Sequence, residues 1–315
     1  MEVRSFWHLN TETSSIESHG VAEKQTFDLV QLKTLCSHIS LGSEGLVAEG
    51  KIPFSLMQQM KVPYQKGDFS FPVQYGYSLI AEDDKGNRFH LMHPHQDRVM
   101  ATSSELTLIP DEFSNQKAAQ ISNMETVVNA IWDSGFQYGD QILICGIGSI
   151  GILMALTLKN QIGINLKLKE TNPEKQAVLK SLGFDLVEND ATSFDICFHC
   201  SGRPEGLRYC LQQSKTEAKI IELSWYGDKN VSLPLGIDFH YKRIKLIASQ
   251  VSKIPYQLIE KHNFKTRKKL VLDLLKNIEL PAVLFHTIPF DELPQFFQAL
   301  RARKLPSAFL YTVNY

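Results

Sequence analysis

The sequence lacks long apolar runs, basic stretches and paired cysteines. No apolar run approaches the roughly 18 residues of a membrane-spanning helix, and residues 1–20 lack the apolar core of a signal peptide. The net charge of −1, with 21% charged and 43% hydrophobic residues, indicates a globular protein and argues against binding to nucleic acid or a membrane surface. The five scattered cysteines form no C-x-x-C pair, which favours reduced thiols and a cytoplasmic protein: Cys36, Cys145, Cys197, Cys200 and Cys210.

The length of 315 residues predicts two domains, because one hydrophobic core seldom grows beyond about 250–300 residues. The first part of the chain is rich in short β segments separated by polar turns such as Asp83–Asn87. The predicted strands are Thr26–Leu32, Gly76–Glu82, Arg88–Met92 and Leu106–Ile109. Residues 115–135 then have apolar side chains at helical spacing, with Ser114 as the N-cap. This pattern predicts a mainly antiparallel β domain followed by a helix.

A glycine-rich turn follows the apolar strand Ile142–Cys145 and precedes the predicted helix Ile150–Leu158. The G-x-G-x-x-G spacing is formed by Gly146, Gly148 and Gly151. In a dinucleotide site the first glycine permits the turn, the second lets a pyrophosphate approach, and the third lets the helix pack on the strand. The helix N-terminus, at Ser149 and Ile150, would then hold the phosphates through free N–H groups.

An acidic residue ends the next predicted strand, Ile164–Lys169. This residue, Glu170, lies about 20 residues after the glycines, where a carboxylate accepts hydrogen bonds from the adenosine ribose. A carboxylate repels a 2′-phosphate, so Glu170 favours NAD(H) over NADP(H). Asn172 and Pro173 open the next helix.

Strands and helices alternate through the rest of this region, which predicts a parallel, doubly wound sheet. The expected strands are Phe184–Val187, Asp195–His199, Lys219–Ser224 and Lys245–Ala248, with a helix at Pro204–Gln213. The strand Ile164–Lys169 alternates polar and apolar residues, so either one face is solvated or the lysine stems extend outward. The last predicted elements are a helix at Lys265–Lys276, a strand at Leu284–Pro289, a helix at Asp291–Arg301 and a strand at Ala308–Val313. The basic run Lys265–Lys269 is interpreted as a solvated helix face.

The order of these parts, with the motifs GIGSIG, NPEK, HPHQD, NMET and SWYGD, resembles the medium-chain dehydrogenase/reductase superfamily of zinc-type alcohol dehydrogenases. The resemblance spans nearly the whole chain. More narrowly, the chain resembles a bacterial subgroup of zinc-binding dehydrogenases. It implies an α/β fold with a Rossmann NAD-binding domain at 126–254. A GroES-like, mainly antiparallel β domain at 1–125 would be completed by 255–315. It also implies a homodimer.

The residues that hold catalytic zinc in this family are mostly replaced. Ser40 stands where the resemblance expects a cysteine, and Tyr77 and Ser78 replace the histidine and glutamate of a Gly-His-Glu motif. The third ligand falls at or near Glu125, and the four-cysteine lobe of the structural zinc is absent. Because zinc normally takes three protein ligands, the sequence predicts a zinc-independent member.

Without zinc, another side chain must supply the proton. His95 is the first choice, oriented by Glu125 or Asp97, because imidazole donates to a developing alkoxide or enolate. The phenol of Tyr77 is the alternative. Structural roles in a turn remain open for these residues, as does a rebuilt metal site of His93, His95 and Glu125, although Pro94 argues against a regular strand there.

Further cofactor contacts are expected from the resemblance at Lys175, Ser201 and Trp225. Lys175 would stand beside the adenosine ribose. Trp225 and Tyr226 would either cover the nicotinamide or fill the contact between domains. His199 and Cys200 are interpreted as the packed end of a strand.

Three functions follow from these observations. The first is an NAD-dependent oxidoreductase that transfers hydride to or from a small carbonyl, alcohol or enone without zinc. The second keeps the NAD site in a non-catalytic binding or redox-sensing protein. The third is an S-adenosylmethionine-dependent methyltransferase, against which Gly151 and the long β-rich region argue.

Overall fold

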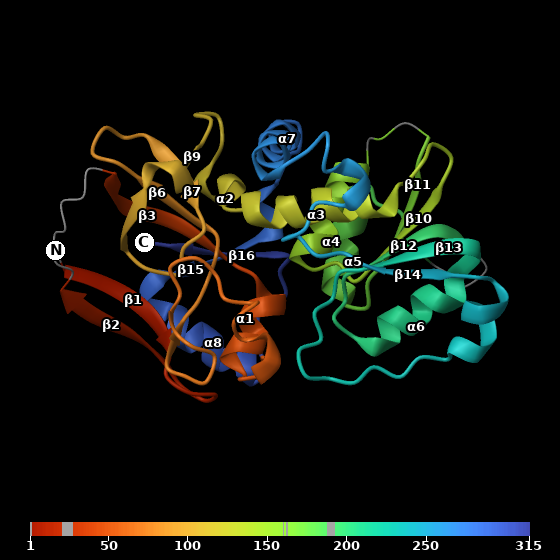
Figure 1. Cartoon of the computed structure of the whole chain (residues 1–315), viewed down its shortest axis with the longest axis horizontal. Helices are drawn as coiled ribbons and strands as arrows, with labels where there is room; N and C mark the ends of the chain where they lie inside the picture. The colour runs from red at the N-terminus through yellow and green to blue at the C-terminus, as the bar shows by residue number, and fades with distance from the viewer. Residues whose placement is uncertain (1, 21–27, 160, 162, 188–192) are drawn as a thin grey trace. The chain divides into compact units, whose positions relative to one another are not determined.

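The computed structural model describes residues 2–20, 28–159, 161, 163–187 and 193–315, and it divides into two units. Unit 1 contains residues 1–122, 284–306 and 310–315, and unit 2 contains 123–283 and 307–309 (Figure 1). Residues 255–283, which were expected to complete the first domain, therefore group with the second. Within this segment the guanidinium of Arg267 contacts Glu125 and Asn129 of unit 2.

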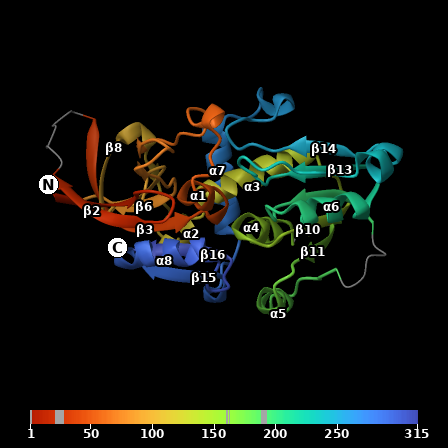
Figure 2. The ribbon, with the colours of Figure 1, turned by 90° about the horizontal axis from the view of Figure 1, so that it is seen from below.

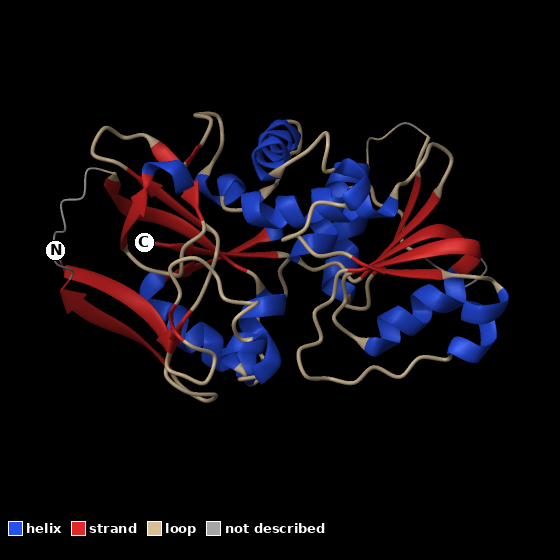
Figure 3. Cartoon of the chain, viewed as in Figure 1, coloured by secondary structure: helices blue, strands red, loops and turns tan. Residues whose placement is uncertain are grey.

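Unit 1 is built on two largely antiparallel sheets, drawn in red in Figure 3. The smaller sheet has the order β2-β1-β5-β4, and the larger has the order β15-β16-β3-β6-β7-β9, with β8 paired to β3. The strands are β1 (Glu2–His8), β2 (Ser14–Gly20), β3 (Leu29–Ile39), β4 (Lys66–Gly67), β5 (Val73–Gln74), β6 (Leu79–Glu82), β7 (Arg88–Leu91), β8 (Arg98–Thr102), β9 (Thr107–Leu108), β15 (Phe285–Pro289) and β16 (Leu310–Asn314). Of these pairs only β15–β16 is parallel. The predicted mainly antiparallel β domain is confirmed.

The sequence interpretation missed the hairpin β1–β2. Val3 and Phe6 on β1 are buried, whereas β2 is mostly exposed or half-buried and carries polar residues. A strand of this composition has no apolar alternation to reveal it. The predicted strand Thr26–Leu32 begins outside the described residues, and β3 starts at Leu29.

Helices of unit 1 include α1 (Leu41–Ala48), α2 (Asn115–Ala118) and α8 (Leu293–Arg301). Ser114 caps α2 by accepting a hydrogen bond from the Lys117 backbone N–H, as predicted. The single helix expected at 115–135 is interrupted at residues 119–120 and continues as α3 (Ile121–Ser134). Short helical turns lie at Phe54–Leu56, Ser103–Glu105, Leu235–Phe239, Tyr256–Leu258, Ala282–Leu284 and Phe290–Glu292.

Unit 2 contains a parallel sheet of order β11-β10-β12-β13-β14, which confirms the predicted doubly wound sheet. Its strands are β10 (Gln141–Cys145), β11 (Asn165–Lys169), β12 (Phe194–His199), β13 (Ser214–Glu222) and β14 (Lys245–Ala248). The predicted strand Phe184–Val187 is wrong: that segment makes one bridge, Leu168 with Leu186. A single bridge does not continue the sheet.

The alternating pattern of β11 follows from its place at the edge of this sheet. Leu168 is fully buried, while its neighbours on both sides are half-buried. The ammonium of Lys169 lies 4.4 Å from the ring centroid of Tyr209, so its stem runs along apolar surface. Both explanations left open by the sequence therefore apply.

Helices α4 (Ser149–Leu158), α5 (Pro173–Ser181), α6 (Pro204–Gln213) and α7 (Phe264–Lys276) complete unit 2. Asn172 caps α5 through the N–H groups of Glu174 and Lys175, as predicted. Helix α4 packs beside β10 and β11, and α6 packs against β10, β12 and β13 (Figure 2). In the described part of the chain, no helix is both long and apolar enough to cross a membrane.

Candidate functional site

The turn after β10 has the geometry of a phosphate-binding loop. A Cβ atom on Gly146, whose φ is +93°, would lie 2.4 Å from Cα of Ser201, and a Cβ on Gly151 would lie 2.3 Å from the carbonyl oxygen of Gly146. Both positions therefore require glycine. A Cβ on Gly148 would meet no atom within 4 Å, so the turn is open to a ligand at its middle glycine.

Helix α4 begins immediately after Gly148, so its first N–H groups, which have no partner within the helix, lie next to this turn. Ser149 and Ile150 occupy its first turn, and the Ser149 hydroxyl donates to the carbonyl of Phe309, 2.9 Å away. The Ser149 side chain is thus fixed within unit 2. Its backbone N–H, which a helix of this kind does not use internally, remains the group suited to a phosphate.

Glu170 lies at the end of β11 and is held against the same turn. Its Oε2 accepts from the Ile147 N–H at 3.1 Å, and its Oε1 accepts from the N–H groups of Thr171 and Asn172 at 2.7 and 2.9 Å. Lys175 donates to the Ile147 carbonyl at 3.2 Å. Burial lowers the pKa of its ammonium, and the negative charge of Glu170 partly offsets this by raising it. Glu170 and Lys175 thus both contact the backbone of Ile147, in the glycine-rich turn.

A hydrogen-bonded network lies at the ends of β12 and β13, which we call the His199 network: Ser201, His199, Glu222 and Ser224. His199 Nδ1 is 2.8 Å from Glu222 Oε1, and its Nε2 is 2.7 Å from Ser201 Oγ. Because a carboxylate only accepts, Nδ1 carries a hydrogen and donates it to Glu222, while Nε2 lies within hydrogen-bond distance of Ser201 Oγ. Ser201, expected near the cofactor, is thereby brought against both Gly146 and His199.

Two aromatic residues follow β13. Tyr226 stacks on His199 with ring centroids 6.4 Å apart, and its hydroxyl donates to Glu222 Oε2 at 3.4 Å. Trp225 is half-buried in the same loop. Tyr226 therefore belongs to the His199 network. The two roles considered for Trp225 remain predictions.

In unit 1, His95 is enclosed by a second network. Its Nε2 is 2.8 Å from Glu44 Oε2, and its Nδ1 is 2.7 Å from Ser37 Oγ, which in turn contacts the Tyr315 hydroxyl at 2.9 Å. The side chains of His95 and Glu44 are only 1% and 2% exposed. Glu44 holds His95 in place of Asp97, which accepts from the Arg4 backbone N–H. Both ring nitrogens of His95 are thus already used within the unit.

Ser40 and Tyr77 lie around the start of α1, next to this network. Ser40 is the N-cap residue of α1, and its backbone N–H donates to Glu44 Oε1 at 2.7 Å. The hydroxyl of Tyr77 is 2.8 Å from Ser43 Oγ. Burial raises the pKa of Tyr77 to about 12, so its phenol keeps its proton at neutral pH. Gly76 permits this arrangement, because a Cβ there would lie 3.2 Å from His95 Nε2.

His93 is buried and points to its own turn, with Nδ1 2.9 Å from the carbonyl oxygen of Pro94. Its ring lies 4.9 Å from that of Tyr64. Across the described ranges, no group of three or more His, Cys, Asp or Glu side chains is arranged to hold a metal ion. The rebuilt site of His93, His95 and Glu125 is not found among them.

Glu125 belongs to unit 2 and pairs with basic side chains. Its Oε1 lies 3.4 Å from Arg267 Nη2, and its Oε2 lies 3.1 Å from Lys268 Nζ. Arg267 is buried and also donates to Asn129 Oδ1 and the Val251 carbonyl, at 2.9 and 2.7 Å. A buried guanidinium needs such partners, so Glu125 stabilises α7 on α3.

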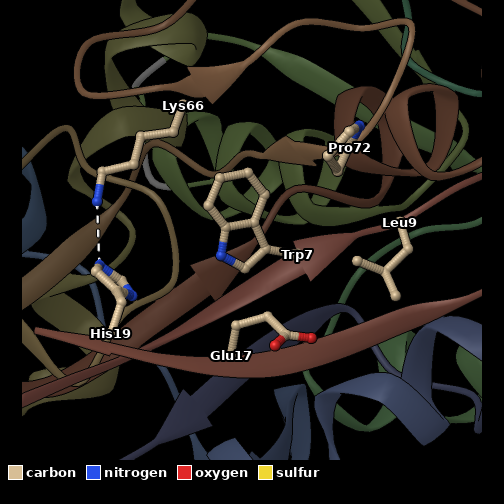
Figure 4. A pocket seen from close by; sticks show the side chains of 6 residues that line it. All are labelled: Trp7, Leu9, Glu17, His19, Lys66 and Pro72. Carbon is tan, nitrogen blue, oxygen red and sulfur yellow. Dashed lines mark hydrogen bonds between the residues drawn. The ribbon is translucent and has the colours of Figure 1, made fainter.

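A separate pocket of about 360 Å³ opens on the β1–β2 hairpin of unit 1 (Figure 4). It is lined by Trp7, Leu9, Glu17, His19, Lys66 and Pro72. Lys66 Nζ points at His19 Nε2 from 3.2 Å, and burial together with this ammonium lowers the pKa of His19. The pocket contains none of the residues predicted for the site.

Sequence reasoning missed Ser37 and Glu44 in unit 1 and the pairing of His199 with Glu222 in unit 2. Glu44 lies one helical turn after Ser40, which is a local signal for a carboxylate near the helix N-terminus. Glu222 pairs with His199 only through the parallel register of β12 and β13. No local pattern reveals that register.

No family model matches the chain. The sequence is 22% identical to the L-threonine 3-dehydrogenase of Rhizobium etli over 218 residues, which are 65% of this chain and 60% of that enzyme. The chain therefore spans about three-fifths of the length of this curated relative.

Two solved structures resemble the chain over its whole length. The 2R,3R-butanediol dehydrogenase of Bacillus subtilis aligns with a TM-score of 0.74 and 19% identity, covering 100% of both chains. The chain therefore shares the fold of this dehydrogenase. The acetophenone reductase of Geotrichum candidum, solved in complex with NAD, aligns with a TM-score of 0.75 and 14% identity over 100% of this chain and 97% of its own. The expected combination of a Rossmann sheet and a GroES-like β domain is confirmed.

The buried histidines of unit 1 predict that stability falls in mild acid. Burial lowers the pKa of His93 from 6.5 to about 4 and that of His38 to about 3. The unfolded chain therefore binds these protons first, so the stability is present above pH 6.5 and is lost as the pH falls toward 4. The urea midpoint should decrease over this range, and His93→Gln should reduce the slope by up to about 1.4 kcal/mol per pH unit.

The exposed His240 supplies the matched control, because His240→Gln should leave the slope unchanged. Equal slopes for wild type and His93→Gln would show that His93 does not titrate differently on unfolding.

Proposed function

We propose that the chain is an NAD(H)-dependent oxidoreductase that transfers hydride between nicotinamide and a small carbonyl, alcohol or enone. The observation that carries this proposal is the open turn at Gly148, with Glu170 held beside it by three backbone N–H groups. Relatives that are dehydrogenases, and a structural neighbour in complex with NAD, support it. The cofactor supplies the hydride, and the protein supplies binding and proton transfer.

Gly146, Gly148, Gly151 and the first turn of α4 fit the pyrophosphate, since backbone N–H groups and space are both present. Glu170 fits the adenosine ribose. Its Oε2 accepts one N–H bond and keeps capacity for a second donor. No ribose 2′-phosphate would be favoured beside this carboxylate, which supports NAD over NADP. Lys175, Ser201 and Trp225 complete the proposed cofactor contacts.

We assign the proton donor to Tyr77 ahead of His95. Its phenol stays protonated at neutral pH, and its hydroxyl lies 2.8 Å from Ser43 Oγ, a neutral group with which it can exchange donor and acceptor roles. Both nitrogens of His95 are engaged by Ser37 and Glu44, so His95 acts as a positioning residue beneath Gly76. Serine and tyrosine hydroxyls at positions 40 and 77 are also poor replacements for the usual zinc ligands, which supports a reaction without catalytic zinc.

A non-catalytic NAD-binding or redox-sensing protein is the second candidate, and it is favoured by the enclosed state of His95. A methyltransferase is the least supported, because Gly151 and the β-rich unit 1 match dehydrogenases. Titration of tryptophan fluorescence with NADH, NADPH and S-adenosylmethionine separates these classes. Binding of S-adenosylmethionine alone would exclude both NAD-based functions.

The cofactor preference should depend on Glu170. Wild type should bind NADH more tightly than NADPH, and Glu170→Ser should reduce that preference roughly tenfold, because a negative charge no longer repels the 2′-phosphate. The measurement is the ratio of the two dissociation constants. Glu174→Ser, which removes an exposed acid from the same segment, is the control. An unchanged ratio in Glu170→Ser would remove Glu170 from this role.

The reduction of carbonyl substrates should depend on the Tyr77 hydroxyl. With NADH and the best substrate from a panel of aldehydes, ketones and enones, Tyr77→Phe should lower kcat about 100-fold while KM changes little. Tyr64→Phe removes a hydroxyl that donates to Glu105 and should retain kcat. A retained kcat in Tyr77→Phe would exclude Tyr77 as donor.

Loss of activity on chelation with recovery on zinc addition would exclude the zinc-independent reaction.

We also propose a homodimer formed along β14, the edge strand of the parallel sheet, on which Leu246 is 40% exposed. An open edge with an apolar side chain is suited to pairing with a second copy. Light scattering should give twice the mass of one chain, and Leu246→Asp should halve it. Leu108→Asp, on the edge strand β9, should not. A monomeric wild type would contradict the proposal.

A further inference from the structure

The order of strands in unit 2 places the His199 network at a defined point of the sheet. Strand β10 has β11 on one side and β12, β13 and β14 on the other, so the order of the parallel strands reverses between β10 and β12. Ligands of doubly wound sheets bind outside the carboxyl ends of the strands at such a reversal. Ser201, which touches Gly146, lies at this point.

The two halves of a dinucleotide occupy opposite sides of the reversal. Glu170, at the end of β11, lies on the side proposed for the adenosine half. The ends of β12 and β13, with His199 and Glu222, therefore lie on the side left for the nicotinamide half. Space is available there, because a Cβ on Gly202 would meet no atom within 4 Å.

The network can hold His199 in either charge state without movement of heavy atoms. When the ring is neutral, Ser201 donates to Nε2 at 2.7 Å. When the ring is protonated, Nε2 donates to Ser201 Oγ, whose hydrogen can turn to the Arg203 carbonyl oxygen at 3.4 Å. Glu222 accepts from Nδ1 in both states. Gly206 leaves room for this exchange, since a Cβ there would lie 2.3 Å from Ser201 Oγ and 2.8 Å from His199 Nε2.

The other titratable groups around His199 leave Glu222 as its charged partner. Cys145 pairs with His199 across β10 and β12, Cys200 follows it in the chain, and Tyr226 stacks on its ring. Burial raises the pKa values of Cys200 and Tyr226, so both stay neutral near pH 7. Arg203 is exposed in the same loop. Protons reach the ring through the partly exposed Glu222 and Ser201, since His199 itself is fully buried.

We propose that His199 is a proton-binding group of the cofactor site whose charge is set by the charge of the bound nicotinamide. This inference rests on the proposed function, because it requires an NAD site. Oxidised nicotinamide carries a positive charge and reduced nicotinamide carries none. A neutral His199 with anionic Glu222 favours the oxidised form, and an imidazolium at His199 Nε2 favours the reduced form. The site thus binds one proton with NADH and releases it with NAD⁺.

Calorimetry of the full chain tests the proposal directly. NAD⁺ and NADH are titrated between pH 5.5 and 8 in buffers of different ionisation enthalpy, which gives the number of protons exchanged on binding. NAD⁺ should release protons, and the ratio of NAD⁺ to NADH affinity should rise about tenfold across this range, equivalent to one pKa unit of coupling. Imidazole is the side chain that ordinarily titrates in this interval.

Variants assign the effect to His199. His199→Asn should abolish the release of protons, whereas His240→Asn, at an exposed position of unit 2, should retain it. Glu222→Gln keeps the shape of the network and should move the pH midpoint of the linkage downward, which provides a test if His199→Asn does not fold. The inference is overturned if Glu222→Gln exchanges as many protons as wild type with the same pH midpoint. It is also overturned if a folded His199→Asn releases as many protons as wild type.

The outcome also separates this inference from the proposed function. If both cofactors bind and neither exchanges protons, the role of His199 is excluded while the NAD site stands. If neither cofactor binds, both proposals fail.

Discussion

The close approach of β10 and β12 at their carboxyl ends is the constraint on which unit 2 depends. The loop after β12 lies so near the turn after β10 that any side chain at position 146 would overlap Ser201. The same turn admits helix α4 only because Gly151 has no Cβ. Glycine at 146 thus has two consequences. It shapes the phosphate turn, and it places Ser201, with the His199 network behind it, at the same end of the sheet.

The two histidine networks differ in the solvent exposure of their carboxylates. In each, a histidine lies between a serine and a glutamate, which satisfies both ring nitrogens and removes the cost of burying an unpaired polar group. In unit 1 the carboxylate of Glu44 is also buried, so the network is closed and holds α1 against the segment of His95. In unit 2 Glu222 is 13% exposed and Ser201 is half-buried. Of the two networks, only the one in unit 2 has a carboxylate that reaches solvent, as the proposed proton exchange requires.

The parts of the fold that were predicted correctly depend on local chemistry. The caps at Ser114 and Asn172 and the glycine turn need only neighbouring residues, and helix α6 (Pro204–Gln213) was bounded by its proline and its apolar spacing. The failures need distant partners. Phe184–Val187 has the composition of a strand, but it finds only one bridging partner at the edge strand β11. In the hairpin β1–β2, strand β2 has no alternation of apolar residues. Strand β1 is stabilised by the burial of its side chains against residues distant in the sequence, which a local pattern does not reveal.

In the candidate site, too, features set by neighbouring residues could be predicted and contacts between distant residues could not. The glycine turn could be predicted because it is one continuous segment, whereas His95 was assigned an orienting acid from the wrong part of the chain. Its partner Glu44 lies 51 residues away, and nothing in the spacing reveals that contact. Pairing of His199 with Glu222 likewise needs the register of two parallel strands.

The two acids at the carboxyl ends of β11 and β13 therefore differ in the groups that they contact. Glu170 is held by backbone N–H groups, and in the proposed site its carboxylate distinguishes NAD from NADP. Glu222 contacts an imidazole, and under the proposed role of His199 the charge on that side of the sheet depends on the bound nicotinamide.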